Sequence, residues 1–262
     1  MKTETSNHTN ILFNQRINSL DITNITFDEY LVATDKWEEA ISNFSTMKEI
    51  LKMEYVFSFD INQINWLKAN NQNTEEFRID MGVFNNQVML ILIPLDSNGS
   101  SIEQENYECA LLKELETDLV LTEKQTVTTT KNFVFSKEGK NLKGETIEKT
   151  SIKKPAISID NAVEIIENWR NNAVEWFHTE STKYRGQRVF RKFYVPIHDV
   201  QSENLTKSIC TFALKETKSG QQKYLPTLVF INHKQVDNFI DIDIFDWTKP
   251  EPPYRPGGGG FD

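Results

Sequence analysis

The sequence predicts an α+β protein made of two tandem, divergent copies of one helix–strand–short helix–strand–strand unit, with antiparallel sheets each covered by a long helix. Three observations lead to this prediction. ITFDEYLVATDKW at 25–37 aligns without a gap on ISIDNAVEIIENW at 157–169, the same order of strand patterns follows both segments, and turn residues separate those strands. Internal repeats are considered before individual elements, because the whole fold is assigned wrongly when a repeat is overlooked.

Each aligned segment has the pattern of a helix start. Thr26 and Ser158 are hydroxyl N-cap candidates, and Thr26 with Glu29 forms a T-x-x-E capping box. Asp28 and Asp160 put negative charge in the first turn, where the helix dipole favours it. We expect an amphipathic helix of about five turns in each copy. The apolar positions that indicate it are Leu31, Ala40, Ile41 and Phe44 in the first copy, and Val163, Ile166, Trp169, Ala173 and Trp176 in the second.

The strand patterns after each helix also match. VFSFDI at 56–61 resembles VPIHDV at 195–200, and both end at an aspartate, Asp60 or Asp199, that has the character of a cap for a short second helix. Two strands then form a hairpin in each copy. In the first copy Asn85 and Asn86 tolerate the positive φ of a tight turn, and in the second a longer polar loop contains Gly220. The hairpin segments are FRIDMGVF and VMLILIPLD in the first copy, and SICTFALK and LPTLVFINH in the second.

These patterns divide the chain into five parts. They are a flexible N-terminus at 1–20, a first repeat unit with extra strands at 21–136, a Lys/Gly-rich linker at 137–156, a second repeat unit at 157–248 and a Pro/Gly-rich tail at 249–262. The extra strands are expected in 107–135, where they would extend the sheet of the first copy, and a helical turn around Cys109 is the alternative.

Composition limits the function classes. The formal net charge is −9 and the isoelectric point about 5.1, which argues against a nucleic-acid partner and favours a protein, a basic one in particular. No signal-peptide pattern is present, and the longest apolar run is Val88 to Leu95, so we expect a cytoplasmic protein without a membrane span. Cys109 and Cys210 are expected to be reduced and buried, with a single disulfide as the alternative.

We expect no catalytic residue, no cofactor and no metal site. His178 and His198 are the candidate general bases, but neither has a nucleophile or metal motif around it. His178 is expected to close a helix, and His198 to precede an aspartate at a strand end. The acidic segment FIDIDIFDW alternates, which predicts a half-buried strand with Asp241 and Asp243 on its solvent face; a metal site is the alternative.

Asp241 and Asp243 also belong to a possible interaction surface, and two further features are candidates for it. Basic residues interleaved with aromatics could contact phosphates, neutralise acidic faces of the protein itself, or form a solvated loop; they are Lys183, Arg185, Arg188, Arg191 and Lys192. The tail, with Trp247 and Tyr254, would either present a polyproline II ligand at PEPP or fold back over a sheet edge.

The second copy ends in FDWTKPEPPYRP, and this ending carries a resemblance. It resembles a group of small uncharacterised bacterial proteins with a helix–strand–helix–hairpin unit and a tail of the form D-[FW]-[ST]-x-P-C-P-P-x-C. Glu251 and Arg255 stand at the two cysteine positions, so a disulfide or metal site of that tail would be missing here. The resemblance covers the second copy well, the first copy weakly and the middle not at all. It implies the architecture and no activity.

The function expected from the sequence is therefore non-catalytic binding of another protein. A specific version is an immunity-like inhibitor whose acidic charge attracts a basic partner. Two alternatives stay open. One is an enzyme of unrecognised type with a pocket between the two copies, and the other is a structural or envelope-associated component tethered by its tail.

Overall fold

The computed structural model describes residues 22–115, 119–124, 130–135, 141–144, 157–200, 204–217, 223–236, 239–246 and 248–251. The expected fold class is confirmed, because helices pack on sheets in which all neighbouring strands are antiparallel. The helices are α2 (Phe27–Ile41), α3 (Phe44–Ile50), α4 (Ile61–Asn70) and α5 (Ile159–Tyr184), with a 3₁₀ turn η2 at Ile197–Val200. The expected segment 1–20 lies outside the described residues.

The strands form two large sheets and a small one. The first sheet has the order β1-β5-β4-β3-β9-β13. Its strands are β1 (Asn24–Thr26), β3 (Glu76–Phe84), β4 (Gln87–Ile93), β5 (Asn106–Leu111), β9 (Lys192–Pro196) and β13 (Lys249–Glu251). The second sheet has the order β12-β11-β10-β2. Its strands are β2 (Phe57–Asp60), β10 (Leu205–Glu216), β11 (Tyr224–Val236) and β12 (Phe239–Phe245).

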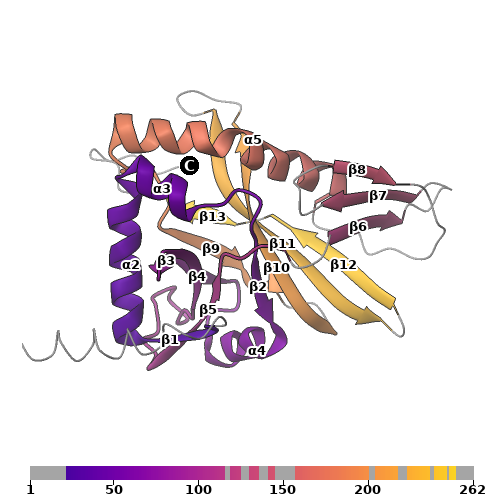
Figure 1. Ribbon diagram of the computed structural model, residues 1–262. Helices are drawn as coiled ribbons and strands as arrows, with labels where there is room; N and C mark the ends of the chain where they lie inside the picture. Colours follow the sequence, from indigo (N-terminus) through magenta and orange to yellow (C-terminus); the bar gives the residue numbers. More distant parts are fainter. Residues whose placement is uncertain are drawn as a thin grey trace, which may run out of the picture.

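The two halves of the chain exchange one strand with each other. The order long helix, strand, short helical segment, hairpin, strand occurs in both, as α2-β2-α4-β3-β4-β5 and as α5-β9-η2-β10-β11-β12, but the first half has an additional helix, α3, between α2 and β2. However, β2 pairs with β10 of the second half, and β9 pairs with β3 of the first half. Each sheet therefore contains strands from both halves (Figure 1). Duplication of one unit stays a prediction.

The helix starts follow the local sequence. Thr26 caps α2 and forms the expected capping box with Glu29, while Ser158 caps α5 by accepting a hydrogen bond from the backbone N–H of Asn161. Asp60 caps α4, where Gln63 completes a second capping box. The two long helices differ in length, since α2 ends at Ile41 and α5 continues to Tyr184. His178 therefore lies inside α5 and not at its end.

The turns and additional strands agree with the sequence only in part. Asn85 and Asn86 have φ of 46° and 60°, the left-handed conformations expected in the tight β3–β4 turn. Strand β5 does extend the first sheet beside β4. The next two strands do not extend that sheet; they pair with each other and with a third strand in the small sheet. Its members are β6 (Leu119–Lys124), β7 (Thr130–Phe135) and β8 (Asn141–Gly144), the last within the expected linker.

Apolar side chains from both sheets form one shared core. Phe77 and Ile79 of the first sheet and Phe57 and Phe212 of the second are buried in the same cluster. The outer face of the first sheet packs on the N-terminal half of α2, and the outer face of the second on the N-terminal half of α5. Figure 1 shows α2 and α5 as separate covers over the two sheets. The described residues between the halves thus pack as an apolar core.

The C-terminal ends of α2 and α5 meet. Gly186 has φ of 72°, and a Cβ atom built there would lie 2.6 Å from the carbonyl oxygen of Ile41. That carbonyl accepts a 2.9 Å hydrogen bond from Ser181 Oγ. Trp37 of α2 donates a 2.9 Å hydrogen bond from Nε1 to the carbonyl oxygen of Phe190. These contacts fix the two covering helices to each other. Leu31, an expected core position, is 45% exposed.

The strand register corrects one expected equivalence. Phe77 pairs with Val195, and Ser208, its predicted counterpart, pairs with Phe59. With Ser208 as the predicted counterpart of Phe77, the counterpart of Phe59 is Val195. The counterpart of Asp60 is then Pro196 and not Asp199. In agreement, Asp199 lies within η2 and is buried, and it does not cap a helix.

Candidate functional site

Strand β12 is the terminal strand of the second sheet. It pairs antiparallel with β11 from Phe230↔Phe245 to Val236↔Phe239. The N-terminal part of β12 and the end of β11 extend away from the two covering helices, at the lower right of Figure 1. The candidate site is this part of the strand, 239–243, which we name the free edge.

The direction of the outward backbone groups follows from one hydrogen bond. The N–H of Ile157 donates to the carbonyl oxygen of Ile244 at 3.4 Å, so the polar groups of Ile244 point away from β11. Because alternate residues of a strand point to the same side, the N–H and C=O groups of Ile240 and Ile242 also point away from β11. Within the described part of the chain these groups have no hydrogen-bond partner.

The other terminal strands of the two large sheets are shorter than β12. Short strands, β1 and β13, lie at the two edges of the first sheet. At the β2 edge of the second sheet, Val56 and Lys113 exchange two backbone hydrogen bonds of 2.9 Å. On β12, the described backbone groups that point away from β11 at Ile240 and Ile242 are available to another strand.

Side chains on β12 alternate as the sequence predicts. Ile244 is 1% exposed and Ile242 packs against the same apolar cluster under α5. Asp243 is not on an open solvent face: it is only 17% exposed and forms an ion pair with Lys234 of β11. In the strand register, Asp241 pairs with Lys234, and Asp243 pairs with Asn232.

A buried polar cluster lies beside this part of the sheet. Ser208 Oγ donates a 2.7 Å hydrogen bond to Oδ1 of Asn232, and Asn232 Nδ2 donates to the carbonyl oxygen of Asp199. The ring of His198 meets the ring of Phe245 of β12 edge-on, with 6.1 Å between centroids. The cluster therefore joins η2 to all three long strands of the second sheet.

Asp199 is the most perturbed acid of the cluster. Its side chain is fully buried, and Oδ1 lies 3.0 Å from Nε2 of the exposed His198 ring. Among the described residues, neither carboxylate oxygen accepts a hydrogen bond with good geometry. Burial raises the pKa of Asp199 to about 7, repulsion by Asp246 adds to the rise, and Lys215 opposes it.

A second buried network ties α2 to the first sheet. Arg78 donates from Nε to Oδ1 of Asp80 at 2.7 Å and from Nη2 to Oδ2 at 3.0 Å. Tyr30 of α2 donates a 2.8 Å hydrogen bond to the same Oδ2, and Arg78 also reaches Ser101 Oγ at 3.0 Å. Burial, followed by the charge of Asp80, raises the pKa of the Tyr30 phenol far above its usual range. Every member has a partner, so this cluster stabilises the fold.

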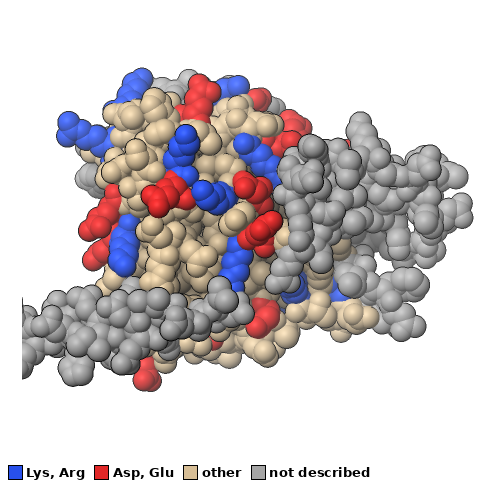
Figure 2. Space-filling model, in the orientation of Figure 1, with Lys and Arg blue, Asp and Glu red and all other residues tan. Residues whose placement is uncertain are grey.

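The expected basic surface is used mainly within the protein. Arg191 forms a two-pronged ion pair with Glu38 of α2, and Arg188 lies 3.4 Å from Glu180 and 4.1 Å above the ring of Tyr184. Lys183 lies 5.2 Å above the same ring, Arg185 ends α5 in a left-handed conformation, and Lys192 lies in β9. Figure 2 shows that basic and acidic residues are interspersed on the visible face, without a patch of one sign.

The tail begins by folding back onto the first sheet. Pro250 of β13 pairs with Phe193 of β9, which agrees with the fold-back alternative and removes this proline from a free polyproline ligand. Trp247 and Tyr254 lie outside the described residues. The two cysteines are free and buried.

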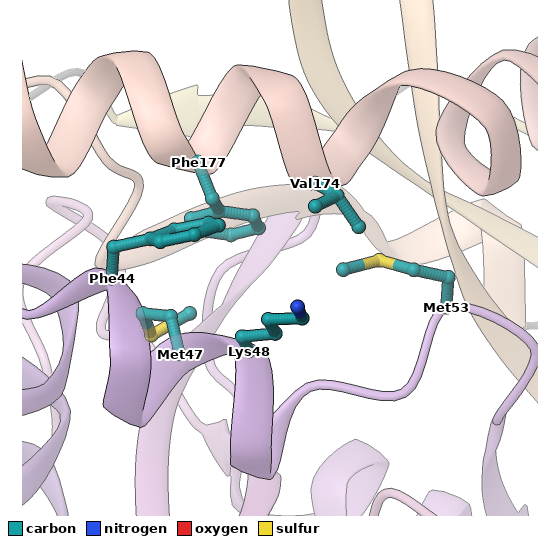
Figure 3. Close-up of a pocket in the computed structure, with 6 residues that line it drawn as sticks. All are labelled: Phe44, Met47, Lys48, Met53, Val174 and Phe177. Carbon is teal, nitrogen blue, oxygen red and sulfur yellow. The ribbon is translucent and has the colours of Figure 1, made fainter.

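One small hollow lies between α3 and α5. Phe44, Met47 and Lys48 of α3, Met53, and Val174 and Phe177 of α5 line it (Figure 3). It is shallow and apolar, with room for about one water molecule. In the described parts of the chain, no three His, Cys, Asp or Glu side chains are grouped to hold a metal ion.

No protein-family model, curated protein or solved structure matches the chain. Within the ranges that the structure describes, no helix combines the length and the apolar character of a membrane span. The sequence places Asp241 and Asp243 in a possible interaction surface, but it does not predict an open strand edge, because the position of β12 in its sheet depends on pairings between distant segments.

Proposed function

We propose that the protein binds another protein without catalysis, by accepting an extended segment of the partner as an additional strand beside β12. The observation that carries this proposal is the outward direction of the backbone groups of Ile240 and Ile242, which have no partner among the described residues. In strand addition, backbone hydrogen bonds supply much of the affinity, and alternate side chains supply the specificity.

The sheet behind β12 suits this role because it is extensive and supported. The β10–β11 ladder runs from Leu205↔Lys234 to Glu216↔Tyr224, and α5 packs on its outer face through Ile159, Ala162 and Ile166. Binding to a sheet that is already ordered costs less conformational entropy than binding to a sheet that must become ordered at the same time.

Two finer statements accompany this proposal. The net charge of −9 would speed association with a basic protein, which is the behaviour of an immunity-like inhibitor. We also propose that the protein acts in the cytoplasm, because buried free thiols at Cys109 and Cys210 suit a reducing compartment.

A substitution at Ile242 tests the proposal directly. The Ile242→Pro variant removes an outward N–H while it leaves the hydrogen bonds to β11 in place. Ile242→Ala is the matched control, because it loses the side-chain packing but keeps the N–H. Peptides selected from a random display library on the wild-type protein are synthesised, and their binding to both variants is measured by fluorescence anisotropy.

We expect the selected peptides to bind the wild type and Ile242→Ala, and to lose at least about tenfold in affinity for Ile242→Pro. Circular dichroism verifies that both variants are folded. Selected peptides that bind Ile242→Pro as tightly as Ile242→Ala would show that this edge is not the binding site.

A further inference from the structure

We infer that η2 is a pH-dependent joint between the two large sheets, which stays closed while Asp199 is protonated and opens locally when Asp199 ionises. The inference does not depend on strand addition at β12. The chain runs from β9 of the first sheet through η2 toward β10 of the second, so this turn is one of the covalent connections between the sheets. A change in η2 therefore affects contacts with both sheets.

Backbone and apolar contacts hold η2 closed. The N–H of Ile197 donates a 2.8 Å hydrogen bond to the carbonyl oxygen of Glu75, just before β3. The carbonyl oxygen of Asp199 accepts a hydrogen bond from the side chain of Asn232 of β11. Ile197 and Val200 are buried in the shared core. These contacts attach η2 to the first and the second sheet at once, and they keep the Asp199 side chain away from water.

The Asp199 carboxylate is buried without hydrogen-bond donors. Within the described part of the chain, neither of its oxygens accepts a hydrogen bond. A protonated carboxyl group tolerates such a position better than a carboxylate, because a buried charge without hydrogen bonds loses its hydration. Burial accordingly raises the pKa of Asp199 to about 7. Opening of η2 would return the carboxylate to water, so ionisation of Asp199 and opening of η2 favour each other.

The charges next to Asp199 do not replace the lost hydration. Asp246, which follows β12, opposes the ionisation of Asp199, and Lys215 of β10 favours it but is itself ion-paired with Asp246 at 3.0 Å. On η2, Nε2 of His198 lies 3.0 Å from Oδ1 of Asp199, in an exposed ring that also contacts Phe245 of β12. A proton on this ring would attract the carboxylate, so the contribution of His198 has to be separated by experiment.

The other ionisable groups on the strands around η2 have different partners or directions. Lys234 of β11 is ion-paired with Asp243 of β12. The side chain of Glu75 is exposed. Several ionisable residues alternate with core-facing neighbours and therefore lie on the outer faces of the two sheets. They are Glu76, Arg78 and Asp80 of β3, Lys192 and Tyr194 of β9, Lys207 of β10 and His233 of β11.

Hydrogen exchange followed by mass spectrometry tests the joint. The reporter is a peptide that contains Ile197, because the hydrogen bond of this amide is lost when η2 opens. Exchange rates are measured from about pH 5.5 to about pH 8 for the wild type and Asp199→Asn, and the ratio of the two rates at each pH removes the intrinsic pH dependence of exchange. Glu75→Gln is the matched control, since it removes an exposed acid beside η2 but keeps the carbonyl group that binds Ile197.

We expect the exchange at Ile197 in the wild type, relative to Asp199→Asn, to rise at least about tenfold from about pH 5.5 to about pH 7.5, because the opening equilibrium changes by up to about tenfold per pH unit while Asp199 titrates. Glu75→Gln and His198→Gln should keep this rise. Asp246→Asn should make the rise smaller and end it at a lower pH, because the repulsion that favours protonated Asp199 is removed. About 1 M urea should not change the rate, since a local opening exposes little surface.

Three results would overturn the inference. A ratio that stays constant with pH would mean that ionisation of Asp199 does not open η2. A rise that disappears in His198→Gln would make His198 the titrating group. An exchange rate at Ile197 that increases with urea as steeply as that of the most protected peptides would mean that the amide exchanges through global unfolding. If Asp199→Asn does not fold, the comparison of Asp246→Asn with the wild type and Glu75→Gln makes the same decision.

Discussion

Tyr30 of α2 donates a 2.8 Å hydrogen bond to Asp80 of β3, and the same carboxylate is held in a two-pronged contact by Arg78 of that strand. The network belongs to the first half of the chain only. At the corresponding positions of β10, in the predicted match of 77–84 with 208–215, stand Ile209 and Thr211. The predicted match thus sets an ionic pair in the first half against a largely apolar pair in the second.

The Asp80→Asn variant should lose about 3 kcal/mol of unfolding free energy, because a buried guanidinium is left without its counter-charge. Tyr30→Phe should lose about 0.5–1.5 kcal/mol, the usual contribution of one hydrogen bond. The double variant Arg78→Ile with Asp80→Thr should be more stable than Asp80→Asn, because both charges are removed together. Urea unfolding measures all three, and a double variant less stable than Asp80→Asn contradicts this account.

Gly186→Ala should destabilise the protein more than Gly99→Ala. Both glycines have positive φ, 72° and 82°, so both alanines carry about 1–2 kcal/mol of backbone strain. Only at Gly186 does the new Cβ also meet backbone, the Ile41 carbonyl at the junction of α2 and α5, whereas nothing lies within 4 Å at Gly99. Thermal unfolding of the two variants separates strain from steric overlap, and equal losses would mean that the helix junction yields easily.

Asp199 gives a pH dependence opposite to that of an ion-paired aspartate. Its pKa of about 7 in the folded protein lies above the ordinary value of 3.8, so the folded state holds the proton more tightly than the unfolded state. Stability from this group is therefore present below about pH 4, falls between about pH 4 and 7 by at most about 1.4 kcal/mol per pH unit, and stays low above that.

The difference in unfolding free energy between Asp199→Asn and the wild type should accordingly grow from pH 4 to 7, with the variant the more stable at pH 8. Urea unfolding at a series of pH values provides the comparison, and other titrating groups cancel in the difference. A wild type that gains stability relative to Asp199→Asn as the pH rises would contradict a raised pKa of Asp199 in the folded protein.

Cutting the chain between the halves should leave one folded particle. A protease site inserted within 145–156, in the segment expected to be a linker, separates β2 and β3 from β10 and β9 on different fragments, yet these strands are paired. We expect both fragments to elute together in size-exclusion chromatography and to unfold in one transition. Separate elution under native conditions would mean that the exchanged strands contribute little to stability.

What the sequence predicted correctly depends on local chemistry. The capping box of Thr26 and Glu29, the Asp60 cap and the positive φ of Asn85 and Asn86 arise from residues within a few positions of each other, so short patterns are sufficient to identify them. The free edge of β12 was beyond such patterns, because a strand becomes terminal only through the pairing of segments far apart.

The incorrect expectation for Asp199 has a similar origin. The alignment of VFSFDI with VPIHDV by residue type makes Asp199 the counterpart of Asp60. In the structure Phe77 pairs with Val195 and Ser208 pairs with Phe59, so the two strands are shifted relative to that alignment. The sequence does not predict the strand exchange either, because the residue pattern of β2 is the same whether β2 pairs with the hairpin of its own half or with that of the other half.

The exchange has a consequence for how the protein is made on the ribosome. When the first half emerges, β3 still lacks β9, and β2 has no sheet to join until β10 has been synthesised. The aromatic residues of the shared core, such as Phe57 and Phe77, stay uncovered during that interval. While most of its length is translated, the nascent chain therefore avoids aggregation only if aggregation is slow or if chaperones bind the exposed residues. A ribosome that stalls midway releases a product with open strand edges that no later strand covers.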